Sequence, residues 1–268
     1  MKYALVNNIK SEALKGLKGK CQCCASEVIA KCGAYRIHHW SHKKTKSCDP
    51  WWETETEWHR RWKNCYPSNW HEFLFEDAEN NEKHIADIHT EHNLVIEFQH
   101  SHIDPNERVS REKFYKNMIW VVDGTRLQRD YPRFQKWANG YRTAIKKDIF
   151  IVDSPEDVFP KNWLNSSVPV IFDFKGMEEL VENNDLRHKL YCLFQVKINH
   201  KSKYLIAVIS RKAFTKTTIT GDWEIKFQEY IKSLRPKEEQ APQKQKTQAK
   251  PIKKQGSHYY DPKKGKLM

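Results

Sequence analysis

The order of apolar and polar residues along the chain predicts a mixed α/β fold. Trp51, Trp58 and Trp62 recur at helical spacing, and the proline before them suits a helix start, so this helix is predicted to bury an aromatic face. Farther along, IADIH and LVIEFQ are short β-rich runs separated by the polar TEHN, which is the pattern of a β-hairpin. Strand-like runs return in the second half at VPVIFDF, LYCLFQVKI and KYLIAVISRKAF. The pattern therefore predicts a central α/β core followed by a second α/β region.

The acidic residues of the predicted helix divide between its two faces. Glu53 and Glu57 fall opposite the tryptophans and are predicted to face solvent, as is Arg60. Glu55 instead lies beside the aromatic stripe, where a carboxylate needs a partner because burying it alone is costly. From the helix alone, the favoured interpretation is a Glu55–His59 pair, one turn apart, that supports the helix.

Two carboxylates interrupt the apolar pattern of the predicted hairpin. Because side chains alternate across a strand, Glu97 and Gln99 share one face, and Asp87 lies among apolar neighbours on the partner strand. Acids in such surroundings are costly to bury unless something neutralises them, and a hard divalent cation such as Mg²⁺ would do so through oxygen ligands. The alternative is a pair of edge-strand acids that face solvent.

Five of the seven cysteines lie between Cys21 and Cys48, which favours a metal site over disulfides in a cytosolic protein. Cys21 and Cys24 have the C-x-x-C spacing at which two thiolates converge on one zinc ion. His42 and Cys48 are the candidates for the second pair of ligands, with His39 as the substitute if His42 faces away. The alternative is a patch of reduced cysteines with solvated histidines.

The segment between these two pairs of candidate ligands predicts a second, shorter hairpin. EVIAKCGAYRI alternates apolar and polar residues, with Gly33 near its turn. Cys23 and Cys32 are then predicted to stay outside the metal site, although Cys23 is close enough to displace a neighbour.

Composition narrows the class of protein. The chain has 268 residues, 38% of them hydrophobic, with ten tryptophans, which is enough to build a core. No apolar run approaches the ~20 residues that a membrane span needs, and the first residues have no pattern of a secretory signal. We therefore expect a soluble, cytoplasmic protein rather than a membrane protein or a secreted disulfide scaffold.

The positive charge lies mostly toward the two ends of the chain. The formal net charge is +13, and residues 235–268 hold ten Lys or Arg against three Asp or Glu. This stretch is rich in Gln, Pro and Lys without apolar periodicity, so we predict a disordered basic tail. The first fifty residues are also basic, which favours a polyanionic partner. A tail that only keeps the protein soluble is the alternative to one that contacts nucleic acid.

The order of the motifs resembles the competence protein CoiA-like family. The chain shows C-x-x-C, then HHWSH, ETEWHRRWK, ADI, IEFQHS, SREKFY and IWVVD, so the resemblance covers residues 21–123. That family is described by a zinc-ribbon-like N-terminus and a nuclease core of the PD-(D/E)xK type, related to restriction endonucleases. The resemblance therefore implies structural Zn²⁺, catalytic Mg²⁺ or Mn²⁺, and DNA as the substrate.

The resemblance also implies roles for individual residues. Asp87 matches the metal-binding aspartate, and Glu97 matches the acid of the E-x-K/Q element. Gln99 stands where many members of the wider superfamily have lysine, and Glu55 matches the carboxylate on the preceding helix. His59 and Lys63 match the rest of that helix motif. Arg111 and Tyr115 match site-facing residues of the helix that follows the hairpin.

The resemblance implies a metal-dependent DNA nuclease that hydrolyses phosphodiester bonds in DNA processing, transformation or defence. We expect a zinc-binding module at 1–50, a nuclease core at 51–148, an α/β region of unassigned role at 149–234 and a basic tail at 235–268. The C-terminal half is the candidate surface for a protein partner. The alternative function is a DNA-binding or scaffold protein with an inactive nuclease core.

Overall fold

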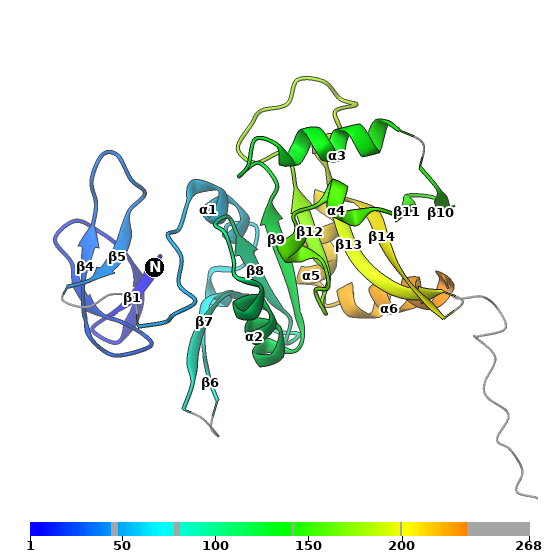
Figure 1. The fold of residues 1–268 in the computed structure, drawn as a ribbon. Helices are drawn as coiled ribbons and strands as arrows, with labels where there is room; N and C mark the ends of the chain where they lie inside the picture. The colour runs from blue at the N-terminus through cyan, green and yellow to red at the C-terminus, as the bar shows by residue number, and fades with distance from the viewer. Residues whose placement is uncertain (44–47, 78–80, 141, 199, 235–268) are drawn as a thin grey trace, which may run out of the picture. The chain divides into compact units, whose positions relative to one another are not determined.

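The computed structural model describes residues 1–43, 48–77, 81–140, 142–198 and 200–234 (Figure 1). The described residues up to Leu234 belong to one compact unit. The predicted basic tail at 235–268 lies outside the described residues. Within those residues, no helix combines the length and the apolar character that crossing a membrane requires.

The N-terminal residues form a five-stranded antiparallel sheet in the order β2-β1-β3-β4-β5. Its strands are β1 (Tyr3–Val6), β2 (Ile9–Glu12), β3 (Lys18–Lys20), β4 (Glu27–Lys31) and β5 (His39–His42). The sheet curls into a half-barrel around a small core that contains Ala4, Val28 and Trp40. The hairpin predicted around Gly33 is present, but its second strand begins at His39, and Gly33 belongs to the connection between β4 and β5.

The rest of the described chain is organised around a nine-stranded mixed sheet in the order β10-β11-β14-β13-β12-β9-β8-β7-β6. The strands are β6 (His71–Glu76), β7 (Lys83–His89), β8 (Val95–Gln99), β9 (Met118–Asp123), β10 (Ala144–Lys146), β11 (Ile149–Val152), β12 (Val170–Asp173), β13 (Lys189–Ile198) and β14 (Lys201–Ser210). The helices are α1 (Glu57–Lys63), α2 (Pro105–Tyr115), α3 (Asp130–Asn139), α4 (Pro155–Val158), α5 (Arg211–Ile219) and α6 (Trp223–Leu234).

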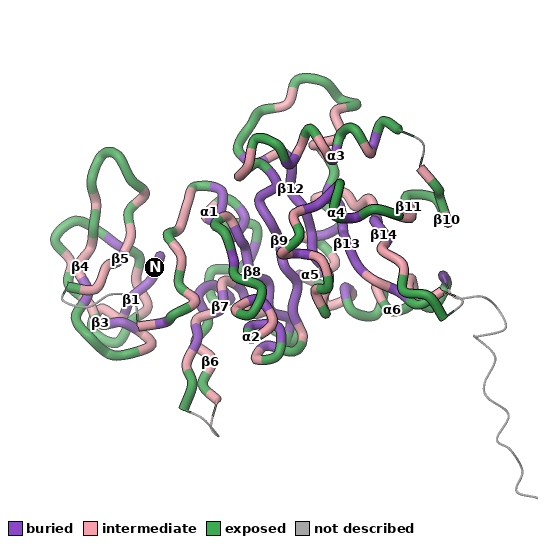
Figure 2. Tube along the Cα trace, in the orientation of Figure 1, coloured by how far each residue is buried: buried purple, intermediate pink, exposed green. Residues whose placement is uncertain are grey.

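Helices cover both faces of the central sheet. Side chains of β9 alternate between two cores, with Ile119 in the first and Trp120 in the second. The first core also takes residues from α1, α5 and α6, and the second takes residues from α2, α3 and α4. The central strands β8, β9 and β12 are therefore buried along their length, as the purple segments of Figure 2 show.

The predicted hairpin of IADIH and LVIEFQ is confirmed as β7 and β8, which pair antiparallel. The three strand-like runs of the second half are confirmed as β12, β13 and β14. They join the same sheet as the predicted nuclease core, because β12 pairs in parallel with β9.

The helix predicted to begin at Pro50 begins later, at Glu57. Thr56 is its N-cap, and the side chains of Thr56 and His59 form a reciprocal capping box that fixes this start. The residues before Thr56 are not helical, so the separation of Glu53 and Glu55 onto opposite helix faces was wrong.

Asp173, at the end of β12, joins the second half of the chain to α1. Its Oδ2 accepts hydrogen bonds from the indole N–H groups of Trp58 at 3.1 Å and Trp62 at 2.9 Å. The Arg211 guanidinium, at the start of α5, pairs with both oxygens of the same carboxylate. Because Asp173 is only 1% exposed, these donors compensate the cost of burying its charge.

We expect Asp173→Ala to lower the free energy of unfolding by about 3–5 kcal/mol, because it leaves Arg211 and two indole N–H groups without their acceptor. Urea denaturation measures this loss. Asp153→Ala is the matched control: Asp153 is exposed and lies 3.9 Å from Lys203, so it should change stability by at most about 0.5 kcal/mol. A loss for Asp173→Ala as small as that of the control would contradict this role.

Candidate functional site

Strands β7 and β8 diverge at the two predicted acids. Backbone pairing between the strands is limited to Ile88 with Ile96 and His89 with Val95. Just beyond these pairs, carboxylates replace carbonyl groups as acceptors of backbone hydrogen bonds. The Asp87 N–H donates to Glu97 Oε1 at 3.1 Å, and the Phe98 N–H donates to Asp87 Oδ2 at 2.9 Å.

Both acids therefore lie inside the sheet rather than on an exposed edge, since β6 is the edge strand next to β7. The Glu97 side chain is 5% exposed and that of Asp87 is 21% exposed. Asp87, Glu97 and Glu55 all line a cavity of about 60 Å³, which Gln99 does not line.

The ammonium group of Lys63, in the last turn of α1, lies among three carboxylates. Its Nζ is 2.8 Å from Asp87 Oδ1 and 3.4 Å from both Glu55 Oε1 and Glu72 Oε1. Burial lowers the pKa of Lys63, but these carboxylates outweigh burial and hold its pKa well above the usual value. Lys63 is therefore a permanent positive charge beside the predicted acids.

Arg111 of α2 is the cationic partner of Glu97. Its Nη1 lies 3.1 Å from Glu97 Oε2, and its Nη2 donates to the Trp51 carbonyl and to Glu107. Burial and the neighbouring Asp87 carboxylate nevertheless raise the pKa of Glu97 to about 8. A bound cation would therefore compete with a proton as well as with Arg111 for the Glu97 carboxyl group.

Glu53 is partly buried, with its side chain 18% exposed, and lies in a hydrogen-bond network, whereas the sequence predicted it to face solvent. His59 Nδ1 accepts from the Thr56 N–H, so Nε2 carries the proton and donates to Glu53 Oε1 at 2.6 Å. Gln99 Nε2 and the Ser101 N–H both donate to Glu53 Oε2, at 3.0 and 3.1 Å. Burial raises the pKa of Glu53, but the hydrogen bonds that its carboxylate accepts from His59, Ser101 and the His100 N–H outweigh burial and lower the pKa to about 2.

Glu55 is buried, as predicted, but with different partners. It pairs with Arg60, 2.7 Å from its Oε2, and with Lys63, rather than with His59. Burial raises its pKa, but the charges of Lys63 and Arg60 reverse this effect and lower it to about 2. Arg60, also predicted to face solvent, reaches Glu55 because Glu55 precedes the helix and folds back over it.

Glu72 is a site residue that the sequence analysis did not single out. Its carboxylate accepts from the backbone N–H groups of Lys2 and Tyr3, at 2.6 and 2.9 Å, and also faces Lys63. Glu72 has a positive φ of 44°, an uncommon conformation for a residue with a side chain. No spacing rule connects Glu72 to α1 or to the N-terminus, so only the folded structure shows this contact.

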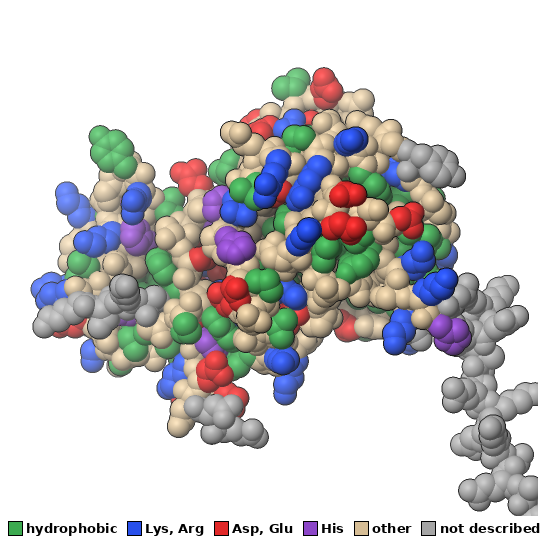
Figure 3. All heavy atoms as spheres, viewed as in Figure 1, with side chains coloured by type: hydrophobic (Ala, Val, Ile, Leu, Met, Phe, Trp, Pro, Cys, Tyr) green, Lys and Arg blue, Asp and Glu red, His purple; other side chains and the backbone are tan. Residues whose placement is uncertain are grey.

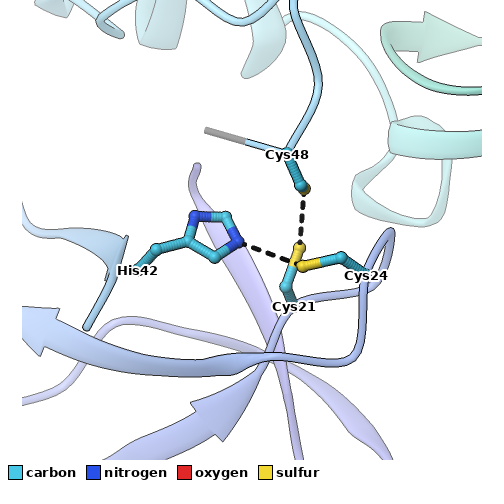
Figure 4. Close-up of side chains that lie close together, drawn as sticks. All are labelled: Cys21, Cys24, His42 and Cys48. Atoms are coloured by element: carbon cyan, nitrogen blue, oxygen red, sulfur yellow. Dashed lines mark hydrogen bonds between the residues drawn. The ribbon is translucent and has the colours of Figure 1, made fainter. Parts of the chain in front are cut away.

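Cys21, Cys24, His42 and Cys48 come together at one side of the N-terminal sheet (Figure 4). Their ligand atoms all lie within 4.8 Å of one another, and among the described residues this is the only such group of three or more. The Cys21 and Cys48 sulfurs are 3.6 Å apart, and Cys24 Sγ is 3.4 Å from His42 Nε2. Tetrahedral zinc would give edges of about 3.8 Å between two sulfurs and about 3.6 Å between sulfur and nitrogen.

This donor set is consistent with a structural zinc ion, and it contains the four residues that the sequence spacing favoured. His39, the predicted substitute, lies elsewhere, with its Nδ1 at the Ile37 carbonyl. Cys23 and Cys32 are outside the cluster, with their sulfurs near the carbonyls of Lys83 and Ala13 respectively.

One thiol of the cluster is already disposed to bind a cation. Burial raises the pKa of Cys24, but hydrogen bonds with Ser26 and His42 outweigh burial and lower it to about 6. The thiolate is the form that binds metal.

Two family models match the chain. Residues 6–50 match the N-terminal domain of competence protein CoiA, and residues 71–149 match the nuclease-like domain of the same protein. The chain belongs to the competence protein CoiA family. The CoiA N-terminal domain includes the whole Cys/His cluster, and the nuclease-like domain includes β7, β8 and α2. Neither a curated protein nor a solved structure matches the chain.

The matches leave residues 51–70 unassigned, although this segment carries Glu53, Glu55 and Lys63. Lys63 contacts Asp87 and Glu53 accepts a hydrogen bond from Gln99, and neither match includes both partners of these contacts.

For the Cys/His cluster, we expect elemental analysis of protein purified without added metal to find about one zinc per chain. Cys24→Ser should lose this zinc and destabilise the N-terminal sheet, because metal binding and folding are coupled. Cys32→Ser is the matched control and should keep its zinc, because Cys32 lies outside the cluster. Natively folded wild-type protein without zinc would contradict the assignment.

For Glu97, we expect a pH-dependent cost of burial. Its pKa is raised from 4.5 to about 8 in the folded state, so the stability it contributes is complete at low pH and falls as pH rises between these values. The difference in unfolding free energy between wild type and Glu97→Gln should change by about 1.4 kcal/mol per pH unit in this range. Urea denaturation from pH 4.5 to 8 measures it, and a constant difference would contradict the raised pKa.

Proposed function

We propose that this CoiA-family protein is a DNA nuclease that depends on Mg²⁺ or Mn²⁺ and has a PD-(D/E)xK-type core. The observation that carries the proposal is the divergence of β7 and β8 at Asp87 and Glu97. Four further carboxylates line the same cavity, so acids outnumber the cations Lys63 and Arg111 around it. Such an excess of negative charge fits a divalent cation.

Asp87 and Glu97 would hold the ion, with Glu55 completing the site directly or through water. Their carboxylate oxygens are the ligands that Mg²⁺ and Mn²⁺ prefer. When bound, the ion would polarise the scissile phosphate and lower the pKa of the attacking water. The cavity of about 60 Å³ holds about two waters, so it suits an ion and its water rather than a nucleotide.

Lys63 supplies the positive charge that Gln99 lacks. In this proposal its ammonium group stabilises the negative charge that develops on the phosphate, as a lysine of the E-x-K element would. Lys63 reaches the site from α1 and contacts Asp87 directly. Because its pKa is raised, it stays charged and acts by electrostatics rather than by accepting a proton.

Gln99 has a positioning role in this proposal. Its amide N–H group donates to Glu53 and to Ser101, which fixes the orientation of the amide. The amide carbonyl is then the group that accepts a hydrogen bond from the attacking water.

DNA is the proposed substrate because a polyanion fits the charge of the protein. The chain carries a formal net charge of +13. On the face seen in Figure 3, Lys and Arg side chains gather around α3, which includes Arg133 and Lys136. Such groups contact phosphates without reading base sequence.

One observation favours the second candidate, a DNA-binding or scaffold protein with an inactive core. Asp87 and Glu97 already have cationic partners in Lys63 and Arg111, so a structural ion-pair network accounts for part of the arrangement. Catalysis requires a metal ion to compete with these partners, and DNA cleavage assays decide between the two candidates.

We expect the purified protein to cleave linear or circular DNA only with Mg²⁺ or Mn²⁺. Asp87→Asn and Glu97→Gln keep side-chain volume and should lower the rate about 10²–10³-fold or more. Lys63→Gln should lose activity similarly, and adding Gln99→Lys to it should restore part, because the charge returns to the adjoining strand. Lys83→Gln is the control: the Lys83 ammonium group pairs with Glu76 on the edge strand β6, and cleavage should be unchanged. Full cleavage by either acid variant would exclude the assignment.

A further inference from the structure

One segment connects the Cys/His cluster to the candidate nuclease site. Residues 48–55, which we call the strap, run from the cluster to the residue before the Thr56 cap of α1. Three ligands of the cluster come from the N-terminal residues up to the end of β5, and the fourth, Cys48, is the first residue of the strap. A zinc ion bound there would cross-link the N-terminal sheet to the strap.

Next to Cys48, Asp49 ties the strap to β7. Its Oδ1 lies 2.9 Å from His84 Nδ1, and its Oδ2 accepts from the Ile85 N–H at 2.9 Å. Asp49 is buried, and Ile85 is two residues before Asp87 on the same strand. Asp49 therefore links Cys48, its neighbour in the chain, to β7, the strand that carries Asp87.

Trp51 ties the strap to α2. Its ring stacks on His84 with centroids 3.2 Å apart, and its carbonyl accepts a hydrogen bond from Arg111. The Arg111 guanidinium also lies over the Trp51 ring, 5.5 Å from its centroid. Because Arg111 is the ion-pair partner of Glu97, the strap holds the group that faces the second acid.

The last residues of the strap contact two further residues of the candidate site, Gln99 and Lys63. Glu53 accepts hydrogen bonds from Gln99, and Glu55 faces Lys63, the partner of Asp87. Lys63, Arg111 and Gln99 thus each contact the strap on one side and belong to the nuclease site on the other.

We infer that the strap couples zinc binding at the Cys/His cluster to divalent-metal binding at Asp87 and Glu97. Zinc fixes Cys48, the strap then fixes Arg111 and Lys63, and these two cations hold the two carboxylates in place for the second ion. The inference rests on the proposed function, because it takes Asp87 and Glu97 as the site of the second metal. Asp49 and Trp51 act as positioning residues, because Asp49 binds His84 and the Ile85 N–H and Trp51 binds Arg111.

Coupling between two binding sites is reciprocal, so it can be measured on the wild-type full chain without removing zinc beforehand. Zinc transfer from the protein to a zinc-selective fluorescent chelator that ignores Mg²⁺ is followed with and without saturating Mg²⁺. We expect Mg²⁺ to lower the apparent zinc dissociation constant by about 5-fold or more, the lower end of typical coupling. Asp87→Asn under the same Mg²⁺ concentration is the control for ionic strength and should show no such effect.

The reverse direction uses calorimetric titration of Mg²⁺. Cys48→Ser should weaken Mg²⁺ binding, whereas Cys65→Ser, which changes an exposed cysteine outside the cluster, should not. Hydrogen exchange of the peptide that spans 48–55 should become faster in Cys48→Ser. If that variant does not fold, the zinc-transfer measurement on the wild type still decides the question.

The possible failures are distinguishable. Wild-type protein that binds Mg²⁺ at Asp87 with no change in zinc affinity would overturn the coupling and leave the proposed nuclease site intact. Wild-type protein that binds no Mg²⁺ in the calorimeter would overturn the proposed function, and the coupling with it.

Discussion

The burial of two carboxylates where β7 and β8 diverge is the constraint on which the candidate site depends. A carboxylate in an apolar sheet is stable only when donors or cations compensate the loss of water. Asp87 and Glu97 obtain backbone N–H donors from each other's strands and then require Lys63 and Arg111. Each cation is in turn held by further acceptors, so the network extends to α1, α2 and the strap.

The same physical rule links the other parts of the molecule. Asp173, at the end of β12, accepts hydrogen bonds from two tryptophans of α1 and pairs with the first residue of α5. The second half of the chain therefore holds α1 over the sheet. Because α1 carries Lys63, the position of the central positive charge depends on a carboxylate contributed by the C-terminal half. This dependence gives β12–β14 a structural role in the nuclease-like region that their sequence did not reveal.

Local patterns predicted the elements and contacts that depend on local sequence. The spacing of Cys21 and Cys24 and the alternation in the hairpin of β7 and β8 are properties of short segments, and both were found. The helix start was wrong because the capping box at Thr56 and His59 outweighs the proline signal at Pro50. Glu53 was placed on a solvent-facing helix surface for the same reason.

The remaining site residues depend on long-range contacts that no short segment encodes. Glu72 faces the site because it binds the backbone of Lys2 and Tyr3, about seventy residues earlier in the chain. Lys63 follows the helix motif of the family resemblance, but its place among three carboxylates appears only in the fold.

In the proposed function, the acids at the divergence of β7 and β8 form a divalent-metal site. Anomalous diffraction from crystals of the protein soaked in Mn²⁺ tests it most directly. We expect an anomalous peak bonded to carboxylate oxygens of both Asp87 and Glu97, with the Lys63 ammonium group beside it. Manganese found only elsewhere in the molecule, with Asp87 still paired to Lys63 and Glu97 to Arg111, would contradict it.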